Sequence, residues 1–264
     1  TNAPQCTGVP VNFANTGSST NVTWEWDFGS GATPAVSNDQ FPQNIVYSTA
    51  GFKGVSLTIT DTTSGCSVTE IIPITIYQSP TASFTSTAPQ CTTVGIDFTN
   101  TGSTGSNWAY SWTFGPGSIP ASSTAENPVG VAYVTAGTKT VTFTISDQNC
   151  TSTATQNITI DVTPTGGIAT TAPQCTGVPV NFSNTGTANG VIWTWDFGGG
   201  SSPSASTEQN PQGVVYNTAG VKSVSLIVTD TLTGCSVQST VIINIYQSPV
   251  ASFTTTAPQC STVG

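Results

Sequence analysis

The chain has 264 residues, of which 36% are hydrophobic and only 6% are charged, and three Lys, twelve acidic residues and no His give a net charge of −9. Soluble proteins usually carry about 25% charged residues, and nucleic-acid binding needs a positive surface that three Lys cannot form. The lack of His excludes imidazole metal sites and His-based acid–base chemistry.

The first predicted elements are short strands that follow a recurrent Ala-Pro-Gln-Cys segment. An apolar–polar–Phe strand comes shortly after it, beginning with Val11-Asn12-Phe13. The segment occurs at residues 3–6, 88–91, 172–175 and 257–260, and the strand recurs at residues 96–98 and 180–182. This self-similarity indicates a tandem array of repeats of about 84 residues.

The next strand of each repeat carries alternating aromatic residues. Trp24, Trp26 and Phe28 share one face because side chains alternate along a strand. The same pattern returns at residues 110–114 and 193–197. We expect Trp26, Trp112 and Trp195 to be core residues, while stacking of a sugar on an outer ring is the alternative.

Each repeat ends with a Tyr…Ala-Gly corner and a long strand rich in β-branched residues. Tyr47…Ala50-Gly51 leads to Val55, Leu57 and Ile59, which would form the opposing layer of a sandwich. Short period-two runs separated by Gly, Pro, Asn and Ser predict an antiparallel β-sandwich. We therefore expect an all-β fold, a tandem array of immunoglobulin-like sandwiches.

The sequence also has a longer period, which covers two successive repeats. Tyr-Gln-Ser-Pro occurs at 77–80 and again at 246–249, so the repeats alternate in type, and residues 255–264 return to the register of residues 1–10. We therefore expect the chain to be one part of a longer array of such repeats.

These motifs resemble those of the PKD family of immunoglobulin-like domains. The resemblance rests on Trp26-Asp27-Phe28-Gly29, on Asn-Pro…Tyr at 127–133 and 210–216, and on the strand from Gly137 to Val141. It implies a β-sandwich for each repeat. Gly-Ser-Gly or Gly-Pro-Gly replaces the Gly-Asp-Gly of the family, so no metal site and no cofactor are expected.

The family's opening Ala-x-Phe strand places the repeat boundaries. It is found at residues 82–84 and 251–253. The expected domains are repeat 1 (1–79), which lacks this first strand, repeat 2 (80–163), repeat 3 (164–248) and the opening strands of a fourth repeat (249–264). The spare strand indicates either an arbitrary cut in an array or strand donation to the next molecule.

Seven Cys in a chain without His favour disulfides and an oxidising, extracellular setting. Each repeat has one Cys before its second strand and one after its last hairpin turn. We expect bridges within repeats, that is Cys6–Cys66, Cys91–Cys150 and Cys175–Cys235, with Cys260 paired elsewhere. The rival is a staple between neighbouring repeats, Cys6–Cys150 and Cys91–Cys235.

No initiating Met, signal peptide or run of 18 apolar residues is present in the sequence. The chain is therefore expected to be a mature or excised piece of a secreted protein without membrane insertion. Enzyme signatures are also missing, because no nucleophile has a general base beside it. We expect no catalytic activity.

Two sets of repeated polar residues are candidates for modification. Lys53, Lys139 and Lys222 occupy one repeat position, where packing along the sandwich edge is favoured over an isopeptide crosslink. Thr62 and Thr231 follow Asp in a pattern that resembles the acceptor of O-glycosylation in Bacteroidota. Asp capping of a tight hairpin turn is the alternative interpretation.

Tandem PKD-like repeats, paired Cys and low charge resemble the large surface adhesins of Bacteroidota. The resemblance implies a non-enzymatic segment of an extracellular adhesin, stalk or filament, at the cell surface or in a secreted fibre. Its expected partners are copies of itself or neighbouring repeats. A carbohydrate-binding array that accompanies a secreted polysaccharide-degrading enzyme, with surface glycans as ligands, is the alternative.

Overall fold

The computed structural model describes residues 1–255, and all the regular structure among them is β-strand. The strands of repeat 1 are β1 (Gln5–Cys6), β2 (Pro10–Val11), β3 (Val22–Asp27), β4 (Ala32–Thr33), β5 (Val36–Ser37), β6 (Ile45–Tyr47), β7 (Gly51–Asp61) and β8 (Ser67–Tyr77). The strands of repeat 2 are β9 (Phe84–Ser86), β10 (Gln90–Cys91), β11 (Phe98–Asn100), β12 (Ala109–Thr113), β13 (Ser118–Ile119), β14 (Ser122–Ser123), β15 (Ala132–Tyr133), β16 (Gly137–Ser146) and β17 (Thr151–Asp161). The strands of repeat 3 are β18 (Ile168–Thr170), β19 (Gln174–Cys175), β20 (Pro179–Val180), β21 (Phe182–Asn184), β22 (Val191–Asp196), β23 (Ser201–Ser202), β24 (Ala205–Ser206), β25 (Val214–Tyr216), β26 (Gly220–Asp230) and β27 (Ser236–Tyr246).

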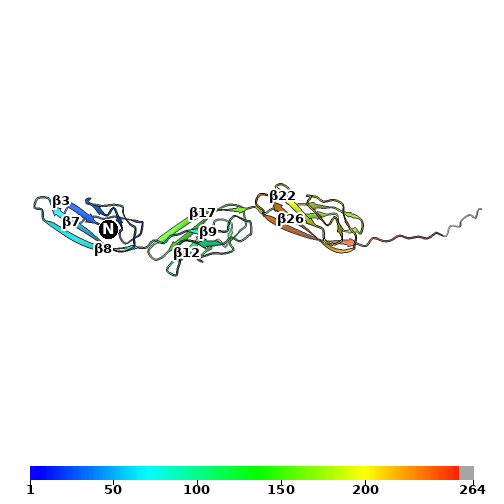
Figure 1. Ribbon diagram of the computed structural model, residues 1–264, viewed down its shortest axis with the longest axis horizontal. Helices are drawn as coiled ribbons and strands as arrows, with labels where there is room; N and C mark the ends of the chain where they lie inside the picture. The colour runs from blue at the N-terminus through cyan, green and yellow to red at the C-terminus, as the bar shows by residue number, and fades with distance from the viewer. Residues whose placement is uncertain (256–264) are drawn as a thin grey trace, which may run out of the picture. The chain divides into compact units, whose positions relative to one another are not determined.

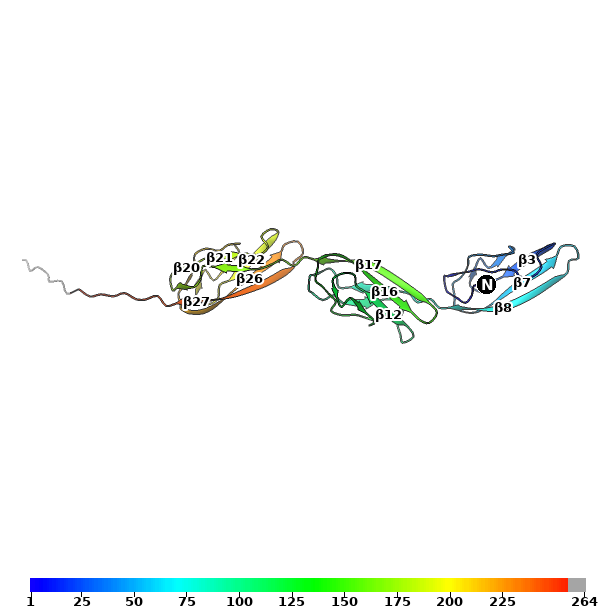
Figure 2. The same ribbon diagram turned by 180° about the vertical axis from the view of Figure 1, so that it is seen from behind.

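Each repeat is built on one five-stranded sheet with the same topology. The strand order is β1-β8-β7-β3-β5 in repeat 1, β10-β17-β16-β12-β14 in repeat 2 and β19-β27-β26-β22-β24 in repeat 3. The long hairpin is antiparallel, whereas β1 joins the end of β8 in parallel with Cys6 opposite Tyr77. Figures 1 and 2 show β7 and β8 running side by side as the longest elements of repeat 1.

A second, smaller layer covers one face of each five-stranded sheet. It is the sheet β2-β6-β4 in repeat 1 and β20-β25-β23 in repeat 3, while in repeat 2 the strands β13 and β15 pair and Ile96 bridges Val131. Repeats 2 and 3 have an additional pair, β9 with β11 and β18 with β21. The all-β sandwich fold predicted from the period-two runs is confirmed.

The core of each repeat lies between these layers. Trp26, Trp112 and Trp195 are buried in separate apolar clusters, as predicted. Each indole N–H donates a hydrogen bond of 2.9 Å to a backbone carbonyl thirteen residues further along the chain. The Trp rings therefore fill the core and also fix the loop that follows the strand.

A buried tyrosine closes each sandwich at the predicted corner. The hydroxyls of Tyr47, Tyr133 and Tyr216 donate to a backbone carbonyl nineteen residues earlier, over 2.7–2.8 Å. Burial raises the pKa of each of these hydroxyls to about 12. The tyrosines are therefore neutral hydrogen-bond donors under ordinary conditions.

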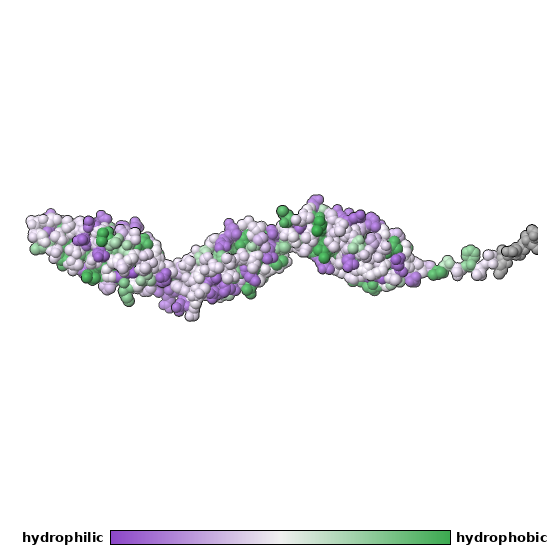
Figure 3. Space-filling view, viewed as in Figure 1, coloured by the Kyte–Doolittle hydropathy of each residue, from purple (hydrophilic) through white to green (hydrophobic). Residues whose placement is uncertain are grey.

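The chain divides into two compact units, Thr1–Ile160, which holds repeats 1 and 2, and a second that begins at Asp161. Apolar residues appear on the surface as small separate patches among uncharged and polar ones (Figure 3). The described part of the chain holds no helix long and apolar enough to span a membrane.

Candidate functional site: an open sandwich edge and a disulfide between repeats

Repeat 1 has an open edge where repeats 2 and 3 have a first strand. In repeat 2 the short strand β9 pairs with β11, and in repeat 3 β18 pairs with β21. The described residues of repeat 1 contain no counterpart of either pair. A groove of about 350 Å³ lies there instead, and it is lined chiefly by Phe13–Ser18, Trp26, Val55, Leu57, Ile59, Val68, Glu70, Ile72 and Ile74.

The floor of this groove is core that the missing strand would cover. Leu57 and Ile59 are only partly buried, whereas their counterparts in the other two repeats are fully buried. Those counterparts are Phe143 and Ile145 in repeat 2 and Leu226 and Val228 in repeat 3. Burial of apolar surface is the main stabilising contribution to folding, and the described residues of repeat 1 leave apolar surface exposed that the first strand covers in repeats 2 and 3.

A glycine at the edge of the groove provides space for a neighbouring backbone. A Cβ added at Gly102 would overlap the carbonyl of Thr81, and one added at Gly186 would overlap the carbonyl of Thr165. At the equivalent Gly17 the nearest atom is Asn15 Oδ1, at 3.3 Å. The described residues of repeat 1 therefore leave space beside Gly17, where a strand backbone lies against the equivalent glycine in repeats 2 and 3.

The turn that holds this glycine is the same in all three repeats. Asn15 donates from Nδ2 to the carbonyl of Ser18 over 2.8 Å, and its Oδ1 accepts from the amide of Gly17 over 2.8 Å. Asn100 and Asn184 make the matching bonds in repeats 2 and 3. This edge of repeat 1 therefore has the same turn that lies beside the first strand in repeats 2 and 3.

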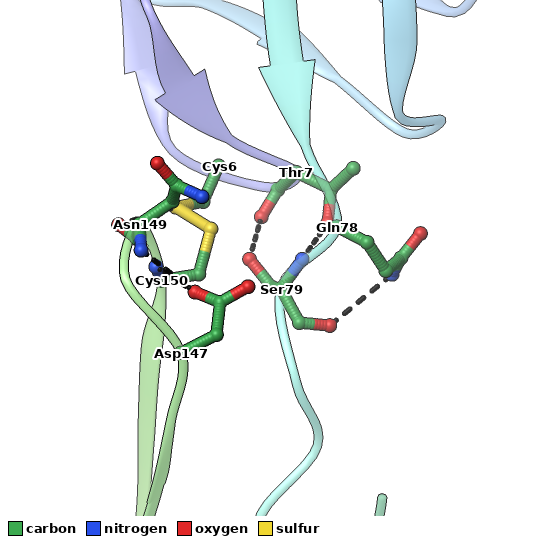
Figure 4. The surroundings of a disulfide bond; sticks show 7 residues. All are labelled: Cys6, Thr7, Gln78, Ser79, Asp147, Asn149 and Cys150. Atoms are coloured by element: carbon green, nitrogen blue, oxygen red, sulfur yellow. Dashed lines mark hydrogen bonds between the residues drawn. A yellow bond between two sulfur atoms is a disulfide. The ribbon is translucent and has the colours of Figure 1, made fainter. Parts of the chain in front are cut away.

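A disulfide joins repeat 1 to repeat 2. Cys6 bonds to Cys150, with their Cα atoms 5.9 Å apart and a sequence separation of 144 (Figure 4). The Asp147 carboxylate accepts hydrogen bonds from the amides of Asn149 and Cys150, and these bonds hold the turn that presents Cys150. The bond closes the junction between two successive sandwiches.

The expected bridge between Cys6 and Cys66 is wrong, and the rival bridge between neighbouring repeats is confirmed for Cys6. Cys6 lies opposite Tyr77 at the end of β8, whereas Cys66 immediately precedes the start of β8. Because β8 has eleven residues at about 3.3 Å each, the two Cys lie at opposite ends of the sandwich. No disulfide can span that length.

The other cysteines fall into two groups. Cys66 and Cys175 are free, which corrects the expectation that they bridge within their repeats. Cys91 and Cys235 are each disulfide-bonded, and the rival pairing of one with the other stays a prediction. Cys260 lies outside the described residues.

The chain leaves repeat 1 in a fixed conformation next to this disulfide. The Ser79 hydroxyl donates to the Thr7 carbonyl over 2.7 Å, and the Ser79 amide donates to Thr7 Oγ1 over 3.0 Å (Figure 4). Ser248 makes the same two bonds to Thr176 at the exit of repeat 3. Repeats 1 and 3 therefore direct the following segment in the same way.

The candidate modification sites lie in the hairpin turns. Asp61 accepts hydrogen bonds from the amide and the hydroxyl of Ser64 and from the amide of Thr63, and these bonds lower the pKa of its carboxyl. Thr62 and Thr231 are exposed, and their hydroxyls donate to backbone carbonyls over 3.0 and 2.9 Å. The turn-capping interpretation of the Asp residues is confirmed, while O-glycosylation stays a prediction.

The three lysines have the packing environment that was predicted. Each Nζ donates to a Thr hydroxyl four residues earlier over 2.8 Å and lies about 6 Å from a buried Tyr ring.

In the described residues the outer rings of Trp24 and Trp193 have buried indole N–H groups without a hydrogen-bond partner. A buried N–H cannot meet a sugar hydroxyl unless the ring moves.

The family of PKD domains matches residues 77–162 and 163–245 of the chain. The chain belongs to the PKD domain family. This confirms the resemblance drawn from the Trp-Asp-Phe-Gly and Asn-Pro…Tyr motifs, and family membership together with disulfide bonds indicates an extracellular protein.

Solved structures of tandem immunoglobulin-like domains are also similar to this PKD chain. The N-terminal eight Ig domains of Down Syndrome Cell Adhesion Molecule have 10% identity and a TM-score of 0.46, and 93% of the chain spans 35% of that structure. The three N-terminal domains of the outer capsid protein Hoc of bacteriophage RB49 have 12% identity, a TM-score of 0.35 and coverage of 93% and 96%. Titin domains I67–I69 have 9% identity, a TM-score of 0.37 and coverage of 93% and 95%. Comparison with curated proteins finds no match.

One functional feature was missed at the level of sequence. Asn-Thr-Gly recurs at residues 15–17, 100–102 and 184–186, at the same spacing as the other repeat motifs. An invariant small residue beside a strand can mark a close backbone approach. That repetition was the available signal for the glycine that lies against the first strand in repeats 2 and 3.

Proposed function

We propose that this PKD chain is a non-enzymatic structural segment of an extracellular adhesin, stalk or filament, in which successive sandwiches are fastened to one another so that they act as a continuous strut. The observation that supports this most directly is the Cys6–Cys150 disulfide between repeats 1 and 2. A bond within a repeat would stabilise that repeat alone. A bond between repeats restrains the junction.

The junction is held at two points. The covalent chain passes through Ser79, which hydrogen-bonds to Thr7, while the disulfide ties the adjacent β1 strand to the hairpin turn of repeat 2. Two attachments remove most of the freedom that a single linker leaves. A strut with stiff junctions projects a distal binding function or packs beside its neighbours.

The open groove of repeat 1 supports assembly by strand donation as the means of extending such a strut. An edge with unpaired backbone groups and an apolar floor is the kind of surface to which extended segments add as a further strand. The partners are then copies of the same chain or adjoining repeats. No catalytic group and no cofactor has a role in this mechanism.

The test is the stiffness of the junction between repeats 1 and 2. Electron microscopy of single oxidised chains should give a narrow distribution of the angle between these repeats. The Cys6→Ser/Cys150→Ser double variant should broaden it, while the Cys66→Ser variant, which removes a free thiol, should not. Equal distributions in oxidised chain and double variant would contradict the proposal.

A glycan array separates this function from the carbohydrate-binding alternative. The strut predicts no specific glycan binding. Specific binding that disappears on Trp24→Ala or Trp193→Ala would instead identify the chain as a carbohydrate-binding array.

A further inference from the structure

We propose that the outer face of the five-stranded sheet in repeat 3 binds the same face of a second copy of the chain, so that two struts associate side by side through their sheets. The outer face consists of the outward-pointing residues of β22, β26 and β27. The inference rests on the proposed function and specifies both the partner and the surface through which neighbouring struts pack.

The alternation of burial along the strands defines this face. In β26, Val224, Leu226 and Val228 are fully buried and belong to the same apolar cluster as Val214 of the smaller layer. Ile227 lies between them in sequence and therefore points to the opposite side of the sheet. β22 and β27 alternate in the same way, and their outward residues are exposed.

The outer face of repeat 3 is unusually apolar. The solvent-facing side of an antiparallel sheet is normally polar, but this one carries four β-branched aliphatic residues that are 36–71% exposed, namely Ile192, Val221, Ile227 and Ile242. The strand register places Ile192 diagonally across from Ile227, and Ile242 diagonally across from Val221. Diagonal neighbours on one face lie about 7–8 Å apart, within reach of each other. The face therefore has two apolar spots with hydroxyl-bearing residues between them.

Repeat 2 shows that the sheet does not need these residues in order to form. It has the same strand order and carries small or polar residues at the four equivalent positions, Ala109, Thr138, Thr144 and Asn157. The apolar residues of repeat 3 are thus exposed and are not required by the fold. Exposed apolar groups of this kind mark contact surfaces.

Adjacent repeats of the same chain leave the outer face open. Repeat 1 is followed by repeat 2 within one compact unit, and yet Phe52 and Ile71 on its outer face are 84% and 67% exposed. Repeat 2 is preceded by repeat 1, and Thr138 and Thr155 on its outer face are also exposed. The outer face is therefore open whether or not another repeat precedes or follows.

The chemistry of the outer face favours a second copy as its partner. Among the described outward residues of β22, β26 and β27, Asp196 alone is charged, so the face has little to attract a charged partner. Between the apolar spots lie hydroxyls such as those of Thr194, Ser225 and Thr240. Because a hydroxyl both donates and accepts hydrogen bonds, two identical faces of this kind complement each other.

Repeat 1 is less suited to the same contact. Its outer face carries the carboxylates of Glu25 and Asp27, which occupy the positions of Thr194 and Asp196. Two such faces brought together would place like charges against each other, which is unfavourable. The contact is therefore assigned to repeat 3.

The size of the face indicates a weak, reversible dimer. β26 and β27 have eleven residues each and β22 has six. At about 3.3 Å per residue and about 4.8 Å between strands, these strands present a flat area of roughly 450 Å². Two such faces fall in the range below about 1,200 Å² that is typical of weak and transient interfaces. Reversible lateral packing of struts needs no larger area.

The test transfers residues of repeat 2 to the outer face of repeat 3. Sedimentation of the full chain, with free thiols alkylated, should show a dimer that grows with concentration. The Val221→Thr/Ile227→Thr/Ile242→Asn variant should raise the dimer dissociation constant at least tenfold. Its thermal unfolding should be unchanged, because repeat 2 folds with these residues. Leu232→Thr is the matched control, since Leu232 is 92% exposed but lies in a hairpin turn, and it should leave association unchanged.

Hydroxyl-radical footprinting locates the contact. Oxidation of Ile242 should fall as the concentration of the chain rises, while oxidation of Leu232 should stay constant. A chain that stays monomeric up to its solubility limit would overturn the inference. Association that the triple variant does not weaken, or protection of Phe52 in place of Ile242, would also overturn it. These outcomes leave the angle between repeats 1 and 2 in single chains unaffected, so the proposed function is tested separately.

Discussion

Truncation of Phe84 tests whether the first strand completes the sandwich core. The ring of Phe84 lies 5.1 Å from Trp112, 6.1 Å from Phe143 and 6.2 Å from Phe98, and the residue is 2% exposed. Replacement of a buried Phe by Ala costs about 3–5 kcal/mol. Phe84→Ala should therefore lower the free energy of opening of repeat 2 by that amount and leave a groove like that of repeat 1.

Hydrogen exchange measures this change in one repeat without interference from the others. A loss of about 3–5 kcal/mol accelerates exchange of the protected amides of β11 and β12 by roughly two to four orders of magnitude, since about 1.4 kcal/mol is a factor of ten. Phe253→Ala is the matched control, because Phe253 has the same repeat position but is exposed, and it should leave exchange unchanged. Acceleration of less than tenfold for Phe84→Ala would refute the reasoning.

Three further predictions concern the close backbone approach at Gly102 and the groups with shifted pKa values. Gly102→Ala should destabilise repeat 2 by about 1–3 kcal/mol in thermal denaturation, because the new Cβ overlaps the Thr81 carbonyl. The matched Gly17→Ala variant should have little effect on the stability of repeat 1. Equal losses of stability in the two variants would contradict the close backbone approach at Gly102. Hydrogen bonds from the turn lower the pKa of Asp61 and Asp230, so their contribution to stability is present above about pH 4 and is lost as the pH falls further, through the folded-state pKa. The urea midpoint should therefore drop as the pH is lowered below about 4, and it should drop less in an Asp61→Asn/Asp230→Asn variant. The pKa of about 12 for the buried Tyr means that stability is intact below pH 10 and falls as the pH rises from 10 to 12; a Tyr absorbance titration that shows all six Tyr ionising near pH 10 would be inconsistent with this.

The fold was largely predictable because the same sequence pattern occurs in each of the three repeats. The alternation of Trp24, Trp26 and Phe28 assigns one face of a strand to the core, and the same alternation recurs in the other two repeats. Agreement among three copies separates a structural pattern from chance. The missing first strand of repeat 1 was also readable, since Ala-Ser-Phe precedes repeat 2 and follows repeat 3.

The disulfide pairing could not be read from spacing. Cys6 and Cys66 are closer in sequence than Cys6 and Cys150, and spacing alone favours the shorter loop. What decides the pairing is the parallel addition of β1 to the far end of β8, which carries Cys6 away from Cys66. Parallel pairing of a two-residue strand leaves no periodic signal in the sequence.

The groove of repeat 1 was predictable in position but not in detail. The sequence shows no Ala-x-Phe strand in residues 1–79, whereas the space beside Gly17, and the amides of Thr16 and Ser18 that make no backbone hydrogen bond within the described residues, depend on how the Asn15 turn holds the edge. Such side-chain turns follow from three-dimensional context. They become visible only when the three repeats are compared in space.

The central claim is that consecutive repeats are joined covalently. Stretching the chain under force tests this claim most directly. With handles at residues 1 and 163, the Cys6–Cys150 bond shields 144 residues from the applied force, which corresponds to about 490 Å of contour length at about 3.4 Å per residue. The account predicts that the oxidised chain stays short and that reduction, or Cys150→Ser, releases this length. An oxidised chain that reaches the same extension as the reduced one would contradict the account.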